Sequence, residues 1–451
     1  MLKTRMKITL GLVATIVVLA LGVAGGWRTG GQANGQQGTA SLALFREVLH
    51  HVRKSYVEEV EPKKLLEGAV NGMISSLDPH SAYLPPEPFN EMKVEIAGSF
   101  GGLGIEISMN DAKLTVVSPI EDTPAWRAGV KSGDHIWKID ETLTRGLTIT
   151  EAVKRMRGEK GTRVTLSILR QGEVKPLVIP LVRDIIKTRS LKARTLAPGY
   201  GYVRVGHFQE RTGEEFAASL ERLRAENGGN LKGLVLDLRN NPGGLLDAAV
   251  AVAGRFVGDR LDNGLIVYTE GREPFANHRF NAVVGEKEPL YPLVVLINRG
   301  SASASEIVAG ALQDHGRAVV MGAPSFGKGS VQTVVPMREG AGLKLTTARY
   351  YTPKGRSIQA KGIIPDIIVE NAELKPVAEE KRENFHEKDL ENHLGAGKDA
   401  GKKEEPEKKK PAPSAPAAAP DSDETKKDYQ LARALDLLQG WEALKKVTAV
   451  K

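Results

Sequence analysis

The chain has 451 residues, of which 41% are hydrophobic and 26% are charged, and its formal net charge is +8. This length is sufficient for two or three globular domains. Because the chain has no cysteine, disulfides, thiolate metal sites and a cysteine nucleophile are excluded. The positive charge is modest for the length, and arginines do not cluster with aromatic residues, so we expect no nucleic-acid partner.

The first segment of the chain resembles an export signal in its charge and hydropathy. Three Lys and Arg residues within the first seven positions precede an apolar run, Ile8–Ala24, whose last residues are small enough for cleavage. The run is also near the lower limit for crossing a bilayer, so an uncleaved anchor is the alternative. The sequence therefore predicts a signal peptide or membrane anchor over 1–26. It also predicts export to the periplasm or to the extracytoplasmic face of the inner membrane.

Two amphipathic patterns follow, Ser41–Tyr56 and Pro62–Ile74, and they predict a helical region over residues 39–95. The turn Leu77-Asp78-Pro79-His80-Ser81 comes directly after them. Three histidines in this region, His50, His51 and His80, raise a metal-site hypothesis. We reject it, because adjacent histidines point to different helix faces and no carboxylate has ligand spacing.

The next region, residues 96–185, consists of short β-rich runs broken by Gly, Pro and Asp. One helix interrupts them, and Thr148 and Glu151 at its start form a predicted capping box. The sequence therefore predicts a small β domain with one helix. The β-rich runs are Gly104–Ser108, Leu114–Val117, His135–Ile139, Val164–Leu169 and Leu177–Leu181.

Two segments of this β domain, Phe100–Ile105 and Pro124–Asp134, resemble the characteristic motifs of PDZ domains. The resemblance implies that a glycine loop binds a peptide's C-terminal carboxylate through backbone N–H groups. A peptide tail would then add as a strand between the sheet edge and the helix. For the loop alone, a plain hairpin turn is the alternative. The loop residues assigned in this way are Gly102, Leu103, Gly104 and Ile105.

The third region, residues 186–372, alternates strands with helices, which is typical of an α/β layer. The pattern predicts a strand over Gly201–Val205, a helix over Thr212–Ala225, a buried strand over Gly233–Leu238 and a helix over Leu245–Val257. At the end of the buried strand, Asn241-Pro242-Gly243-Gly244 could turn backbone N–H groups outward.

The segment Asn298–Gln332 carries the candidate chemistry. After an apolar strand, Leu293–Ile297, a turn of small residues leads to a helix that begins near Ser305. This geometry presents a serine at a helix N-terminus, where free N–H groups and the helix dipole favour negative charge. A strand over Ala318–Met321 then leads to a lysine between two glycines, Lys328. Because a desolvated lysine can remove the proton of a serine hydroxyl, the segment predicts a Ser–Lys dyad.

Two runs in this segment, Ser301-Ala302-Ser303-Ala304-Ser305-Glu306 and Phe326-Gly327-Lys328-Gly329-Ser330-Val331-Gln332, resemble the catalytic motifs of the carboxyl-terminal processing peptidases, or tail-specific proteases. The resemblance implies that Ser303 is the nucleophile, Lys328 the general base and Gln332 the residue that orients the lysine. It also implies supporting roles for two acidic positions, Glu306 and Asp314. The implied oxyanion hole consists of the Ala304 N–H with Gly243 or Gly244.

The end of the chain is less informative. Leu343–Tyr351 and Ile364–Val369 are strand-like, and we interpret them and the segment between them as scaffold. Residues 373–427 form a linker, and its Lys-, Glu-, Pro- and Ala-rich composition predicts disorder. Residues 428–451 recover helical periodicity, either as a docking helix or as a self-association element.

The sequence thus predicts a multidomain fold: N-terminal helices, a PDZ β-sandwich-like domain, an α/β protease core and a C-terminal helix. The predicted function is an exported serine endopeptidase that recognises protein C-terminal tails and needs no cofactor or metal. An adaptor protein, self-association and membrane attachment are further partner hypotheses. The alternative function is an inactive PDZ scaffold at the membrane.

Overall fold

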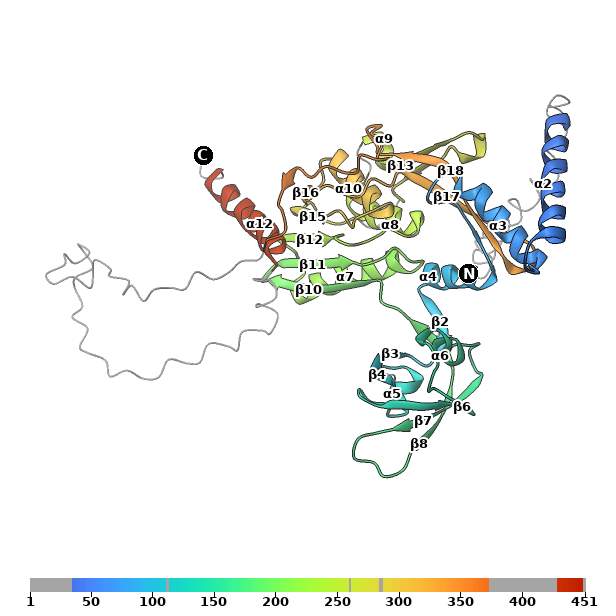
Figure 1. The fold of residues 1–451 in the computed structure, drawn as a ribbon. Helices are drawn as coiled ribbons and strands as arrows, with labels where there is room; N and C mark the ends of the chain where they lie inside the picture. The colour runs from blue at the N-terminus through green and yellow to red at the C-terminus, as the bar shows by residue number, and fades with distance from the viewer. Residues whose placement is uncertain (1–34, 111–112, 259–260, 284–286, 373–427, 449–451) are drawn as a thin grey trace, which may run out of the picture. The chain divides into compact units, whose positions relative to one another are not determined.

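The computed structural model describes residues 35–110, 113–258, 261–283, 287–372 and 428–448 (Figure 1). The chain divides into two compact units, Met1–Pro79 and His80–Lys451. The predicted signal or anchor over 1–26 and the predicted linker over 373–427 lie outside the described residues. Among the described helices, none is both long and apolar enough to cross a membrane.

The described part of the first unit consists of two helices, α2 (Gly35–Ser55) and α3 (Pro62–Ser75). Both helices were predicted, although α2 begins before the predicted Ser41. A proline lies at the start of α3, where its missing N–H costs no intrahelical hydrogen bond.

In the second unit, a six-stranded antiparallel sheet forms the β domain. Its order is β3-β4-β5-β7-β8, and the short β6 pairs with β5. The five predicted β-rich runs are all confirmed as strands. The elements are β3 (Ile105–Asn110), β4 (Lys113–Pro119), α5 (Pro124–Arg127), β5 (His135–Ile139), β6 (Thr142–Leu143), α6 (Ile149–Met156), β7 (Arg163–Leu169) and β8 (Leu177–Val182).

The helix α6 begins with the predicted capping box. The Glu151 backbone N–H donates to Thr148 Oγ1 at 3.2 Å, and the Thr148 N–H donates to Glu151 Oε2 at 2.8 Å. On its inner side, α6 buries Ala152 and Met156 against the sheet. Since β3 is the edge strand beside this helix, its outer edge has no partner among the described strands and is available to pair with another one.

A second, six-stranded sheet is the centre of the α/β core. Its order is β10-β11-β12-β15-β16-β19, and all pairings from β11 onward are parallel. The strands are β10 (Leu191–Ala197), β11 (Tyr200–Val205), β12 (Gly233–Asp237), β15 (Leu293–Ile297), β16 (Val319–Gly322) and β19 (Ile367–Ile368). The helices between them are α7 (Thr212–Glu226), α8 (Leu246–Val257) and α10 (Ala304–Asp314).

Both faces of this parallel sheet are covered, as its continuous apolar strands require. Leu234 and Leu236 of β12 face α7, α8 and α10, whereas Val235 faces the opposite side. On that opposite side lies α12 (Tyr429–Thr448), which packs against β12, β15 and β16 through Leu431, Ala434 and Leu438. The C-terminal segment is therefore a docking helix, which was one of its two predicted roles.

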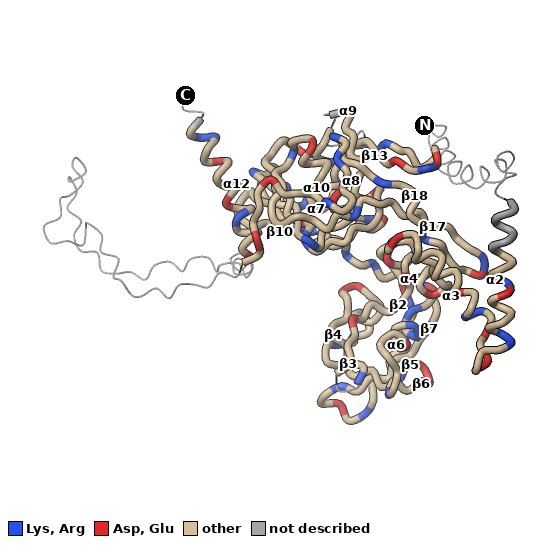
Figure 2. Tube along the Cα trace, turned by 45° about the horizontal axis from the view of Figure 1, so that its top comes forward, with Lys and Arg blue, Asp and Glu red and all other residues tan. Residues whose placement is uncertain are grey.

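Charged residues of both signs occur along α12 (Figure 2), although its exposed positions also include Trp441, Leu444 and Val447. Among the charged residues, Arg433 pairs with Asp436 at 2.6 Å one turn apart. Such exposed pairs contribute little to stability, so the buried leucines hold the helix in place.

A five-stranded antiparallel sheet completes the core, with β17 and β1 both pairing with β18. Its long β17–β18 hairpin directly follows the predicted lysine segment. Only β18 was predicted in this sheet. Its strands are β1 (Ala82–Leu84), β13 (Leu265–Gly271), β14 (Arg279–Asn281), β17 (Ser330–Pro336) and β18 (Gly342–Tyr351).

One strand prediction was too long: of Ile364–Val369, only Ile367–Ile368 form β19, because the Asp366 side chain, rather than a backbone carbonyl, accepts from the Val320 N–H of β16. The helix α4 was not predicted as an element of its own. The remaining elements are α4 (Pro86–Ala97), β2 (Ser99–Gly102), β9 (Asp184–Lys187), α9 (Leu261–Gly264) and the short 3-10 helices η1 (Pro274–Ala276) and η2 (Arg338–Gly340).

The docking of α12 predicts unequal effects for two leucines on the same helix. We expect Leu438→Ala to lower the free energy of unfolding by about 2–5 kcal/mol, because Leu438 is 1% exposed and its loss leaves a cavity. Leu444→Ala is the matched control, since Leu444 is 62% exposed and should change stability by less than about 0.5 kcal/mol. Denaturant unfolding of both variants measures this, and equal effects would contradict the docking.

Candidate active site

Ser303 lies at the N-terminal end of α10, directly after the turn that follows β15. Its backbone is strained, with φ 56° and ψ −114°, a region that non-glycine residues rarely occupy. Strain of this kind costs about 1–3 kcal/mol and persists only where the surroundings enforce it. The turn therefore holds this serine in one particular orientation.

The surroundings that enforce it come from the end of β12. The Ser301 hydroxyl donates to the Leu238 carbonyl at 2.7 Å. The Asn241 carbonyl accepts from the Ala302 N–H at 3.0 Å and from the Ser305 hydroxyl at 2.9 Å. Residues on both sides of Ser303 are thus bound to the loop that contains the Asn-Pro-Gly-Gly motif.

Glu306 connects this serine turn to the lysine segment. Its carboxylate is fully buried and accepts four hydrogen bonds. Oε2 accepts from the Ser303 N–H at 2.7 Å and from the Lys328 N–H at 2.9 Å. Oε1 accepts from the Ser325 hydroxyl at 2.6 Å and from the Gly327 N–H at 2.7 Å. One carboxylate therefore binds the backbone of both candidate catalytic residues.

Burial and hydrogen bonding act on Glu306 in opposite directions. Burial raises the pKa of Glu306, whereas the hydrogen bonds from Ser325, Gly327, Ser303 and Lys328 lower it, and the net direction is upward. Since three of the four donors are backbone N–H groups, they can only pair with an acceptor oxygen. All four hydrogen bonds can therefore form only while both carboxylate oxygens of Glu306 act as acceptors.

Lys328 is partly buried between two glycines that allow close backbone packing. A Cβ on Gly329 would lie 2.5 Å from the Gln359 nitrogen, and one on Gly327 would lie 3.1 Å from the backbone of residues 360–362. The Lys328 carbonyl accepts a hydrogen bond from the Tyr350 hydroxyl. The lysine segment is thus packed against β18 and the segment that follows it, in keeping with their predicted scaffold role.

Gln332 lies in β17, opposite Thr346 of β18. Its amide nitrogen donates to Ser330 Oγ at 3.0 Å and to Thr346 Oγ1 at 3.3 Å. These partners fix the side chain on the β17–β18 hairpin. Thr346 also donates its N–H to Ser81 Oγ at 3.0 Å, so Ser81 lies beside this hairpin.

Gly243 lies directly beside Ser303. A Cβ on it would lie 2.8 Å from Ser303 Cβ and 3.0 Å from the Ala304 nitrogen, and its φ is 108°. Its N–H donates to Asn241 Oδ1 at 2.9 Å. Gly244 has φ 136°, and a Cβ there would lie 2.1 Å from the Phe208 carbonyl oxygen. Only glycine fits either position, and Gly243 is the one in contact with the serine turn.

Asp314 is not part of this cluster, because it lies at the opposite end of α10. There it accepts from the Lys354 N–H at 2.9 Å and pairs with Arg356. It therefore anchors the segment after β18 to the end of the helix that carries Ser303.

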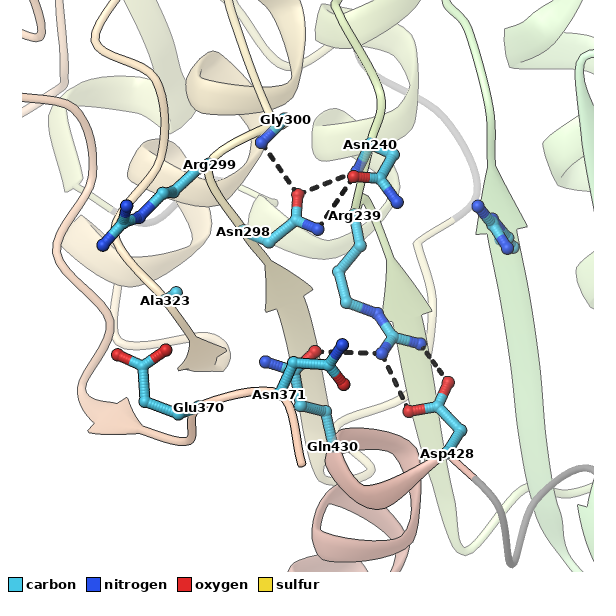
Figure 3. A pocket seen from close by; sticks show the side chains of 11 residues that line it. Arg239, Asn240, Asn298, Arg299, Gly300, Ala323, Glu370, Asn371, Asp428 and Gln430 are labelled. Carbon is cyan, nitrogen blue, oxygen red and sulfur yellow. Dashed lines mark hydrogen bonds and ion pairs between the residues drawn. The ribbon is translucent and has the colours of Figure 1, made fainter. Parts of the chain in front are cut away.

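A polar cavity of about 450 Å³ lies at the carboxyl ends of β12 and β15, and residues of the loops that follow these two strands line it (Figure 3). Across it, the Asn298 side-chain amide donates to Asn240 Oδ1 at 2.9 Å. Arg239 binds Asp237 at 2.7 Å and Asp428, which directly precedes α12, at 2.6 Å. Burial alone would lower the pKa of Arg239, but these carboxylates raise it above its ordinary value. Within the described ranges, no group of three or more acidic or histidine side chains could hold a metal ion.

The β domain contains its own candidate site between β3 and α6. A cavity of about 110 Å³ is lined by all four predicted loop residues, by Ile107 of β3 and by Val153 and Met156 of α6. A Cβ on Gly104, whose φ is 76°, would lie 2.3 Å from Thr123, so this bend requires glycine. The cavity ends at the open edge of β3, where an extended peptide could pair.

Three segments of the sequence match known families. Residues 199–369 match peptidase family S41, residues 101–181 match the PDZ domain, and residues 27–87 match the activating protease CtpB N-terminal domain. The fold and its site thus define a PDZ-containing serine peptidase.

Whole-chain relatives agree with these matches. The chain is 48% identical over 361 residues to a carboxy-terminal-processing protease of Bartonella bacilliformis, covering 80% of each chain. It is 32% identical to the carboxy-terminal processing protease CtpA of Bacillus subtilis, covering 82% of this chain and 78% of the relative. The protein therefore belongs to the carboxy-terminal-processing proteases of peptidase family S41.

Among solved structures, the chain is similar to the photosystem II D1 C-terminal processing protease. The identity is 31%, the TM-score is 0.42, and the match covers 73% of this chain and 92% of that one.

Sequence reasoning missed two residues of the cluster. From the sequence, Asn241 was identified only as part of the Asn-Pro-Gly-Gly motif. In the structure it is fully buried, its carbonyl accepts from the Ser305 hydroxyl, and its side chain accepts from the Gly243 N–H. Tyr350 lay inside a predicted strand, and no sequence signal connected it with Lys328. Both roles depend on contacts between segments far apart in the chain.

The shared carboxylate predicts a large effect for an isosteric change. In Glu306→Gln, an amide NH₂ replaces one acceptor oxygen and faces N–H or hydroxyl donors. We expect the free energy of unfolding to fall by at least about 2 kcal/mol. We also expect kcat/KM on a peptide substrate to fall at least about tenfold per folded molecule, since both loops shift.

Glu214→Gln, in the first turn of α7, is the matched control, because Glu214 is exposed. It should leave both quantities nearly unchanged. Wild-type activity in folded Glu306→Gln would show that the shared carboxylate does not position the loops.

Proposed function

We propose that this protein is an exported endopeptidase in which Ser303 is the nucleophile and Lys328 is the general base. The observation that carries the proposal is the Glu306 carboxylate, which accepts hydrogen bonds from the backbone N–H groups of both residues. A shared acceptor fixes the distance between the two segments, as a nucleophile and its base require.

The chemistry would proceed in two acyl-transfer steps. Ser303 Oγ attacks the scissile carbonyl carbon while Lys328 Nζ accepts the hydroxyl proton. The tetrahedral intermediate collapses to an acyl-enzyme on Ser303, and the lysine gives its proton to the leaving amine. Water then attacks the ester with the lysine again as base, which restores the free serine. The lysine must be neutral before each attack.

The oxyanion would form beside the N-terminus of α10. We propose the backbone N–H of Ala304 as the first hydrogen-bond donor to the oxyanion, because it belongs to the first turn of the helix and adjoins Ser303. The second donor would come from the loop of Gly243 and Gly244. The Gly243 N–H binds Asn241 Oδ1 in this conformation, so it could serve only after leaving that acceptor.

We propose that Gln332 positions Lys328 through the β17–β18 hairpin rather than by contacting substrate. Its three partners on the hairpin, Ser330 O, Ser330 Oγ and Thr346 Oγ1, hold its amide on that scaffold. Asp314 would support the site from the other end of α10, through the segment that covers the lysine loop.

The PDZ domain would supply substrate selection. Its loop at Gly102–Ile105 would bind the terminal carboxylate of a protein tail, and the open edge of β3 would pair with the tail as an added strand. Because the cavity beside α6 is lined by Leu103, Ile107 and Val153, we expect an apolar last residue. An adaptor protein and self-association stay predictions from the sequence.

Export is supported by the sequence of the first segment, a basic start followed by the apolar run Ile8–Ala24. We propose that the catalytic part acts in the periplasm or at the extracytoplasmic face of the inner membrane. It would be either released by signal cleavage or held by the uncleaved segment.

Replacing the nucleophile separates this function from a binding scaffold. We expect Ser303→Ala to lower cleavage of a protein with an apolar C-terminal tail by at least about a thousandfold, because no other group can form the acyl-enzyme. Binding of a tail peptide to the PDZ domain should stay unchanged, as measured by fluorescence anisotropy.

The control is Ser132→Ala, which removes an exposed hydroxyl of the PDZ domain and should cleave as wild type does. Undiminished cleavage by Ser303→Ala would refute the assignment. Tail binding without cleavage in the wild type would favour the scaffold alternative.

A further inference from the structure

Tyr350 is a buried residue of β18 that the mechanism above leaves without a role. Its side chain is 3% exposed and packs in the main hydrophobic cluster of the core. Its backbone N–H donates to the Gly329 carbonyl at 3.0 Å, and its hydroxyl donates to the Lys328 carbonyl. One tyrosine thus binds two successive carbonyl groups of the lysine segment.

This donation requires the phenol to keep its proton. Burial raises the pKa of Tyr350, whereas a hydrogen bond with the Ser303 side chain acts in the opposite direction. The phenol is therefore neutral across the pH range of ordinary proteolysis and keeps its proton to donate.

The lysine peptide needs such a second attachment. Glu306 binds the Lys328 N–H, and the glycines on either side of the lysine contribute no side chains. The catalytic nitrogen lies at the end of a flexible four-carbon chain, so any rotation of this peptide displaces it. With Glu306 on its N–H and Tyr350 on its carbonyl, the Lys328 backbone is held on both sides of its Cα.

We propose that Tyr350 is a positioning residue for the Ser–Lys reaction, because its hydroxyl and its backbone N–H bind the successive carbonyls of Lys328 and Gly329. The proposal rests on the function assigned above to Ser303 and Lys328. Tyr350 does not exchange a proton with substrate. It holds the lysine backbone in place before attack, and small misplacements of reacting groups cost large factors in rate.

The test is Tyr350→Phe, which removes the hydroxyl and leaves the ring in the core. We expect kcat on a peptide ester or tailed protein to fall about tenfold to a hundredfold, the range for losing one hydrogen bond at a reacting centre. KM should stay within about twofold, because the substrate does not contact the phenol. PDZ binding of a tail peptide should not change.

Tyr351→Phe is the matched control. This neighbouring tyrosine stacks on Tyr268 with ring centroids 5.2 Å apart, and its hydroxyl has no place in the mechanism. We expect its kcat to be within about twofold of wild type.

A second measurement separates positioning from stability. Titration of Ser303 with a fluorophosphonate counts reactive sites and gives the rate of serine modification per folded molecule. We expect Tyr350→Phe to reach full stoichiometry at a reduced rate. An unchanged rate and kcat per folded molecule, or a raised KM with unchanged kcat, would overturn the proposal. A variant that does not fold would assign the hydroxyl to stability and would also contradict it.

Failure of the proposed function gives a different pattern. If Ser303→Ala keeps its activity, the dyad assignment itself is wrong, whatever Tyr350→Phe shows. If Ser303→Ala is inactive and Tyr350→Phe has wild-type kcat, the dyad stands and only the role of Tyr350 is refuted.

Discussion

The buried carboxylate of Glu306 is the constraint on which the rest of the site depends. Four donors from two distant segments converge on it, and two of them are the N–H groups of Ser303 and Lys328. Leaving a buried carboxylate unpaired would be costly, so the two segments are stable only when both are in place. A contact that stabilises the fold therefore also sets the geometry of the proposed dyad.

The parallel sheet explains why the serine turn, which leads into the helix that contains Glu306, lies close to the glycine loop. The serine turn and the glycine loop both follow parallel strands, β15 and β12, so they meet at the same edge of the sheet. The sheet stays rigid because both faces are covered, with α12 closing the face that α10 does not. The ion pair of Arg239 with Asp428 links α12 to the loop before Gly243. The C-terminal helix thus contributes to the scaffold of the site.

Local signals were sufficient for most elements, and they failed where structure depends on distant contacts. The periodicity of the apolar runs predicted α7, α8, β12 and β15, and Thr148 with Glu151 predicted the start of α6. Most of α4 lies in the predicted helical region, residues 39–95, but its own periodicity was not recognised. Motif resemblance pointed to Ser303 and Lys328, but only the cross-strand register of β17 and β18 brings Tyr350 to the lysine segment. No spacing in the sequence encodes that pairing.

The most direct measurement is the pH dependence of kcat/KM for wild type and for Lys328→Ala on one tailed protein substrate, with Lys361→Ala as a control at an exposed lysine. If Lys328 is the base, wild-type activity rises with pH along a limb whose apparent pKa lies well below the value of about 10.4 for a free lysine. That limb disappears in Lys328→Ala and is unchanged in Lys361→Ala. A Lys328→Ala enzyme that keeps the wild-type rate and profile would place the base elsewhere and contradict this account.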